Sequence, residues 1–307
     1  VILEGALAEL EEPRTGTGKD GINYISLRGA VQCGDTGVYT RSFRAFIKEK
    51  KTNGEDSKVY KDVVEWLKTA TPMTKNAENP TMVRLQGSLS DNVYVNREGV
   101  LVEGTEVSVQ FFNEFKSFNA SLQLEGYIKD IKPEVRGKDD DAHETGRYKM
   151  HFITRDFYGN TLDLKNIIVP AETYDDIQSI GYDEGATVSI NIDWIPSQTE
   201  EAPKKKSGGF GKQVDLGSTS GNSYLEMILV GGSDPYDEDS KDALSPKIVR
   251  AMMAERTAHI KEVEANGYLG NKGSTASAGS TAKSGGFGKA KTGSFTTIED
   301  DDNDLPF

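Results

Sequence analysis

Residues 37–50 read GVYTRSFRAFIKEK, a stretch in which apolar and polar side chains alternate with a period of two. Alternate residues of a β-strand lie on the same face of its sheet. Tyr39, Phe43 and Ile47 therefore share one face, interrupted by Arg41. The opposite face carries an aromatic side chain among cations, namely Arg44, Phe46, Lys48 and Lys50. The pattern predicts a half-buried strand whose outer face is both aromatic and basic.

The segments around this strand have the same period. Between residues 22 and 115, further stretches with strand character are separated by turn residues: NYISLRGAV, MVRLQGSL, NVYVN and TEVSVQFF. One helix interrupts them, because SKVYKDVVEWLKTA places Val59, Val63 and Leu67 on one face at helical spacing. Strands with a single helix near the middle predict a small closed barrel.

A second block repeats this order of elements. Its predicted strands are ASLQLEGYIKDI, GRYKMHFITRDF, NTLDLKNIIVP, ATVSINIDWI and SYLEMILV, with a short helix at AETYDDIQSIGY. A long loop with a basic centre, residues 197–222, precedes the last of these strands. We therefore predict a mainly β protein with two five-stranded barrels of the oligonucleotide-binding (OB) kind, short helices and a disordered C-terminal tail.

The composition along the chain predicts where the segments divide. We expect an N-terminal arm, or a short helix followed by a loop, at 1–21, a first OB-like domain at 22–117 and a second at 118–233. A helical segment follows at 234–269, with Ser245 as N-cap and Pro246 at the first helical position. Residues 270–298 form a Gly/Ser/Ala/Lys linker, and 299–307 form an acidic tip. The sequence KSGGFGK occurs twice, at 206–212 and 283–289, either as a mobile basic segment or as a generic linker.

The bulk composition limits the classes of function. The 307 residues suffice for about two domains. A net charge of -13 means that binding to a polyanion requires a local basic strip. The single cysteine, Cys33, excludes an internal disulfide and predicts a reducing compartment. No apolar run approaches the ~20 residues that span a membrane, and the N-terminus lacks the pattern of a signal peptide. We therefore predict a cytoplasmic location and no membrane partner.

The enzyme motifs that we tested fail. Residues 13–20, PRTGTGKD, have Pro13 where a phosphate-binding loop needs glycine and Asp20 where it needs Ser or Thr. The scattered cysteine and histidines supply no zinc site. We interpret Cys33 as a small buried residue rather than a nucleophile, and GKDDDAHE at 137–144 as a solvated loop rather than a cation site. The sequence predicts a protein without catalytic residues or cofactor.

The outer faces of the strands gather aromatic side chains among cations. Bases stack on aromatic side chains at about 1–3 kcal/mol each, and cations neutralise the phosphates. We therefore predict binding of single-stranded nucleic acid by Arg44, Phe46, Lys48, Arg84, Tyr94 and Phe112, by Tyr127, Lys129, Arg147, Lys149 and Arg155, and by Lys205, Lys206 and Lys212 of the long loop. In the alternative interpretation, the same aromatic side chains face a second domain, an oligomer partner or a virion interface.

The stretch that ends the sequence, DDDNDLPF, resembles the acidic tip of bacterial and phage single-stranded-DNA-binding proteins. The matching residues are Asp300, Asp301, Asp302, Asp304, Leu305, Pro306 and Phe307. Two OB-like units in one chain resemble the phage-encoded type more than the shorter bacterial one.

The resemblance implies a non-enzymatic protein that coats and protects single-stranded DNA during replication, recombination or repair. Its tip would recruit a polymerase, helicase, primase or recombinase. The alternatives are an annealing or recombination factor, or a structural or interaction protein whose acidic tail serves only solubility. The sequence leaves the preference between DNA and RNA open.

Overall fold

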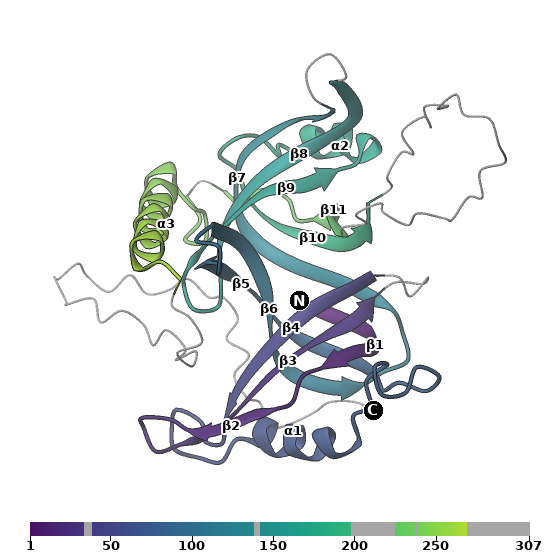
Figure 1. The fold of residues 1–307 in the computed structure, drawn as a ribbon. Coiled ribbons are helices and arrows are strands. Elements are labelled where there is room, and N and C mark those ends of the chain that lie inside the picture. Colours follow the sequence, from purple (N-terminus) through teal and green to yellow (C-terminus); the bar gives the residue numbers. More distant parts are fainter. Residues whose placement is uncertain (34–38, 138–141, 198–224, 238, 269–307) are drawn as a thin grey trace, which may run out of the picture.

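The computed structural model describes residues 1–33, 39–137, 142–197, 225–237 and 239–268 (Figure 1). These residues form eleven strands and three helices, so the prediction of a mainly β protein is confirmed. None of the helices in these ranges has the length and apolar character needed to cross a lipid bilayer.

The first OB-like unit is a closed circuit of five strands. In spatial order they are β1 (Ile2–Leu10), β3 (Asn23–Cys33), β4 (Tyr39–Lys48), β6 (Leu101–Glu114) and β5 (Met82–Val95), and β5 pairs back onto β1. All neighbours are antiparallel except β4 and β6. The helix α1 (Lys58–Thr69) lies between β4 and β5 in the chain, and the short β2 (Arg14–Thr17) pairs with the free edge of β3.

The second OB-like unit has the same connectivity. Its circuit runs through β7 (Asn119–Arg136), β8 (His143–Arg155), β9 (Thr161–Val169), β11 (Leu225–Gly232) and β10 (Thr187–Pro196), which pairs back onto β7. Its parallel pair is β9 and β11, and α2 (Ala171–Ser179) lies between β9 and β10 in the chain. Two OB-like units were therefore predicted correctly. Each parallel pair spans only two residue pairs, which leaves both barrels partly open there.

Strand β1 joins the two units. It pairs with β5 and β3 of the first unit and, from Ile2 to Glu4, with β7 of the second. The prediction of an arm or helix over residues 1–21 is therefore wrong. The sequence ILEGALAEL shows no apolar–polar alternation because both faces of this strand are covered, and Leu3 and Leu7 are fully buried.

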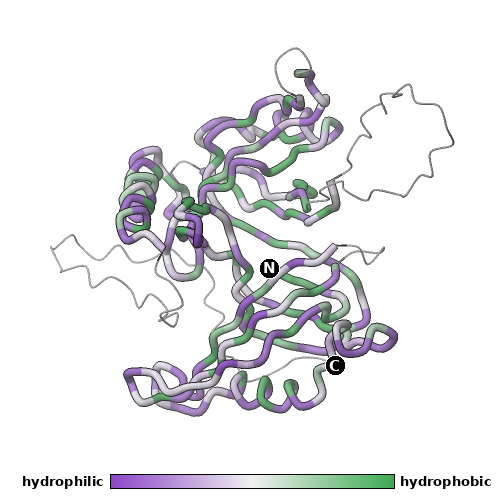
Figure 2. Tube along the Cα trace, viewed as in Figure 1, coloured by the Kyte–Doolittle hydropathy of each residue, from purple (hydrophilic) through white to green (hydrophobic). Residues whose placement is uncertain are grey.

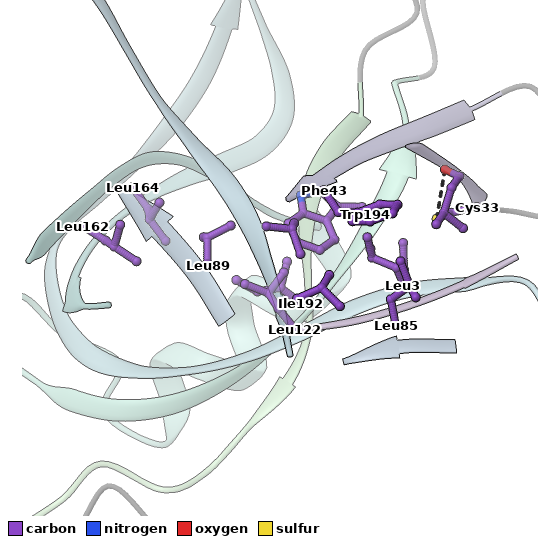
Figure 3. Packing of buried hydrophobic residues seen from close by; sticks show 14 of the residues in the cluster. Leu3, Cys33, Phe43, Leu85, Leu89, Leu122, Leu162, Leu164, Ile192 and Trp194 are labelled. Carbon is purple, nitrogen blue, oxygen red and sulfur yellow. Dashed lines mark hydrogen bonds between the residues drawn. The ribbon is translucent and has the colours of Figure 1, made fainter. Parts of the chain in front are cut away.

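One hydrophobic core runs through both units (Figure 3). Leu3 and Phe43 of the first unit lie in the same cluster as Leu122, Ile192 and Trp194 of the second. Figure 2 shows how hydrophobic and hydrophilic stretches alternate along the strands that surround this core. The two units therefore share buried surface rather than meeting as separate globules.

Helix α3 (Pro246–Asn266) lies against both units, and Ser245 caps it as predicted. Val249 and Met252 are buried against Tyr127 and Ile153 of the second unit. One turn further along, Arg256 is only 8% exposed.

The Arg256 guanidinium binds both units. It donates to the Asp91 carboxylate at 2.5 Å and to the Glu103 carboxylate at 3.1 Å in the first unit. It also donates to the Thr161 carbonyl of the second unit at 3.2 Å. A buried cation that loses its partners costs about 3–5 kcal/mol, so Arg256 opposes relative movement of the two units.

The close approach of β1 to β3 at Gly5 gives a test of this fold. A Cβ atom at Gly5 would stand 1.9 Å from the Gln32 carbonyl oxygen. Gly5→Ala is expected to lower the free energy of unfolding by at least about 1–3 kcal/mol, because the overpacking forces the backbones apart. Gly104→Ala is the matched control, since its nearest atom would lie 4.0 Å away. Urea unfolding measures both, and equal stability of the two variants would contradict the placement of β1.

Candidate nucleic-acid interface

The outer surface of β3 and β4 brings an aromatic pair and three cations together. The antiparallel register places Tyr24 opposite Lys48 and Arg28 opposite Arg44, with Phe46 between the two pairs along β4. We call these five residues the β3–β4 face. Their partners in the alternation, including Ile25, Leu27, Phe43 and Ile47, are buried in the core. The alternation predicted for residues 37–50 is thus confirmed from Phe43 to Lys48.

The aromatic side chains of this face are in contact and accessible. The Tyr24 and Phe46 ring centroids are 4.9 Å apart with an interplanar angle of 32°, and Phe46 is 45% exposed. An exposed aromatic surface on a rigid sheet offers a π-face to an unpaired base without reorganisation.

The cations of the β3–β4 face have weak, exposed carboxylate partners. Arg44 binds Glu106 of β6 at 2.6 Å and Lys48 binds Asp20 at 2.7 Å, with both cationic side chains nearly half exposed. The hydrogen bond from Lys48 lowers the pKa of Asp20. Burial raises the pKa of Glu106, and Arg44 and Arg28 act against this effect. Exposed ion pairs are worth about 0–1 kcal/mol, so a phosphate group can replace either carboxylate.

Phe112 is a correction to the predicted interface. The bulge in β6 opposite Gln86 and Gly87 shifts the alternation by one residue. Phe112 consequently points inward, with its ring centroid 5.0 Å from that of Trp66 and 6.1 Å from that of Phe43. It packs against the core and is not available to a base.

Two more predicted contacts are engaged within the fold. Tyr127 is 8% exposed because α3 covers it. Arg84 binds Glu4 and lies over Phe115, with 3.9 Å between the guanidinium carbon and the ring centroid. Its strand, β5, is not a neighbour of β3, so Arg84 does not belong to the β3–β4 face.

Arg147 belongs to a buried charge cluster rather than to an open surface. It binds Glu134 at 2.7 Å and Glu226 at 2.9 Å, and both carboxylates are almost fully buried. Burial opposes the charge on Glu134, but hydrogen bonds from Arg147 and Thr145 outweigh it and lower the pKa of Glu134 to about 2. Arg147 therefore balances the second unit's own carboxylates.

The other predicted contacts are dispersed. Lys149 lies 3.9 Å from Glu134, and Arg155 contacts the Gly159 carbonyl at 2.8 Å and Glu255 at 3.7 Å. Lys129 and Tyr94 are exposed, on β7 and β5. Lys205, Lys206, Lys212 and the tip residues Asp300, Asp301, Asp302, Asp304, Leu305, Pro306 and Phe307 lie outside the described residues, as does the linker 270–298.

Sequence reasoning missed Tyr24 and Arg28, although alternation within NYISLRGAV places both opposite the buried Ile25 and Leu27. It also missed Phe157 and Tyr158, which stand in a turn where strand periodicity gives no signal.

Other site types find little support in the described part of the chain. It contains no group of three or more His, Cys, Asp or Glu side chains placed to hold a metal ion. Cys33 is buried, as predicted, and burial raises the pKa of its thiol to about 12. A thiol in this state is a poor nucleophile.

Comparison with known proteins gives one family match and distant structural similarities. Residues 1–266 match the model of a family described as YorF. No curated protein matches the chain. The wild-type single-stranded DNA binding protein from Thermus aquaticus is similar at 11% identity and a TM-score of 0.42, over 78% of this chain and 93% of that one. A deletion mutant of the protein from the same organism is similar at 11% identity and a TM-score of 0.40, over 78% and 95%.

The low pKa of Glu134 predicts a specific response to acid. Because the folded-state pKa lies below the ordinary value, the stabilisation is complete above about pH 5 and is lost as the pH falls toward 2. Wild type should lose about 2 kcal/mol from this group between pH 6 and pH 3. Glu134→Gln should be less stable at pH 6 and lose correspondingly less over the same interval.

Urea unfolding at the two pH values measures the difference. Glu65→Gln is the control, because Glu65 forms only an exposed pair with Lys68 and should follow wild type. If Glu134→Gln keeps the full acid dependence of wild type, the cluster does not hold Glu134 ionised.

Proposed function

The chain belongs to the YorF family, and from its structure we propose that it binds single-stranded DNA without catalysing a reaction. The observation that carries this proposal is the β3–β4 face, where the contacting pair Tyr24 and Phe46 is flanked by Arg28, Arg44 and Lys48 on one side of an OB-like unit. OB folds use this part of the barrel for oligonucleotides.

The β3–β4 face offers both components of single-strand binding. Every base has a π-face, so stacking on Phe46 tolerates any sequence. Phosphates that follow the bases meet Arg28, Arg44 and Lys48, and the charge gained offsets the loss of weak ion pairs to Asp20 and Glu106. A duplex keeps its base faces stacked inside the helix, so the same surface discriminates in favour of unpaired strands.

The remaining parts of the chain extend the proposal. We assign residues 22–117 and 118–233 as two domains that coat the strand during replication, recombination or repair in a phage-infected cell, with the loop at 197–222 as an added phosphate contact. We assign residues 299–307 to the recruitment of partner proteins. Their five acidic side chains would favour a basic rim, and Leu305 and Phe307 an apolar pocket.

Substitution of Phe46 tests the function. Phe46→Leu keeps an apolar side chain but loses the aromatic face, and it should weaken binding of labelled oligo-dT about tenfold, from a stacking energy of about 1–3 kcal/mol. Phe46→Trp should bind at least as well as wild type. Fluorescence anisotropy with oligo-dT and with a duplex of equal length, at two salt concentrations, measures the affinities.

The two variants differ only at an exposed site, so equal thermal stability serves as the folding control. Absence of oligo-dT binding by wild type at low salt would refute the proposed function. Equal affinities of Phe46→Leu and Phe46→Trp would remove Phe46 from the binding site.

A further inference from the structure

The turn between β8 and β9 exposes two adjacent aromatic side chains. Phe157 is 66% exposed and Tyr158 is 63% exposed, the highest values among the large hydrophobic side chains in the described ranges. Their ring centroids are 5.5 Å apart with an interplanar angle of 85°. Exposing one aromatic side chain is common, but two together at the end of a hairpin indicate a contact surface.

Hydrogen bonds to Asp156 hold this turn in one conformation. Its carboxylate is buried and accepts from the Tyr158 backbone N–H at 2.9 Å, the Asn160 backbone N–H at 2.8 Å and the Asn160 side chain at 3.0 Å. Gly159 has φ +87°, which an L-residue adopts only with strain. A ligand that contacts Phe157 and Tyr158 therefore does not have to pay for ordering the turn.

The turn lies at the junction of the two units. The Asp91 backbone N–H, on β5 of the first unit, donates to the Asp156 carboxylate at 3.4 Å. Strand β5 pairs with β6, where Ser90 is opposite Glu106, and Glu106 is the carboxylate that binds Arg44. A continuous series of contacts thus connects the β3–β4 face to the turn. Neighbouring strands are about 4.8 Å apart, so the connection is short compared with a bound oligonucleotide.

We propose that Phe157 and Tyr158 form a second base-stacking contact for the same single strand. This inference rests on the proposed function. A strand that leaves the β3–β4 face across β6 and β5 meets the two aromatic side chains, and Arg155 supplies a cation beside them. Arg155 is held by Glu255 at 3.7 Å with both side chains exposed, an ion pair weak enough for a phosphate to replace. The contact would lengthen the binding site beyond the first OB-like unit.

Oligonucleotides of two lengths separate the second contact from the first. A single OB fold covers about 4–16 nucleotides, so oligo-dT of about 8 nucleotides occupies the β3–β4 face alone and oligo-dT of about 30 nucleotides reaches both. The double variant Phe157→Ala with Tyr158→Ala, in the full chain, should bind the short oligonucleotide like wild type and the long one about tenfold more weakly. Val100→Ala is the matched control, because Val100 is 54% exposed near the end of the β5–β6 hairpin. It should bind both like wild type.

A tryptophan at the turn reports the contact directly. Trp66 and Trp194 are buried, so their fluorescence responds little to a surface ligand. Phe157→Trp should be quenched by the long oligonucleotide and not by the short one. Ile180→Trp, at an exposed position after α2, should be quenched by neither.

The outcomes distinguish failure of this inference from failure of the proposed function. If wild type binds both oligonucleotides, unchanged affinity of the double variant and an unquenched Phe157→Trp overturn the second contact and leave the β3–β4 face standing. If the double variant binds DNA normally but loses a protein partner, the turn is a protein contact and the inference is wrong. If wild type binds neither oligonucleotide, the proposed function fails, and the second contact fails with it.

Discussion

The pairing of β1 with three other strands is the constraint on which the molecule depends. Within nine residues this strand closes the first OB-like unit through β3 and β5 and joins the second unit through β7. Backbone groups in a buried strand must be paired, so the position of β1 fixes the edges of both units. The tight passage of Gly5 against the Gln32 carbonyl shows how little freedom this arrangement has.

Two buried arginines strengthen the same junction. Arg41 of β4 lies over the indole of Trp194 of β10, 4.6 Å from the ring centroid, and burial lowers its pKa. Arg256 of α3 binds carboxylates of the first unit and a carbonyl of the second. Buried charges with few partners are costly unless the geometry is fixed. The two units therefore present their outer surfaces in a constant relation, which a polymer that crosses from one to the other requires.

The sequence predicted those parts of the fold and site that follow from local periodicity. The strand from Phe43 to Lys48 has one covered face, so alternation alone placed Phe46 and Arg44 outside. Phe112 was misplaced because the bulge that turns it inward depends on pairing with a strand some twenty-five residues away in the chain. Tyr127 and the strand β1 were misplaced for another reason: each is covered by an element distant in sequence, α3 in one case and the second unit in the other. The partners of Arg147 are equally distant, since Glu226 enters from β11.

The two units show that equal connectivity does not give equal surfaces. The β3–β4 face of the first unit carries Tyr24 and Phe46. The corresponding strands of the second unit, β8 and β9, carry outside their core a set of charged groups that neutralise one another, with His151 between Asp130 and Asp163, and Lys165 on Asp163. Such a surface has no π-face to offer, and its cations already have carboxylate partners. The aromatic side chains of these two strands stand instead in the turn at Phe157 and Tyr158, close to the first unit. A single strand that follows aromatic surface would thus cross the junction rather than the second unit's sheet, and function is set by the placement of a few side chains on a repeated scaffold.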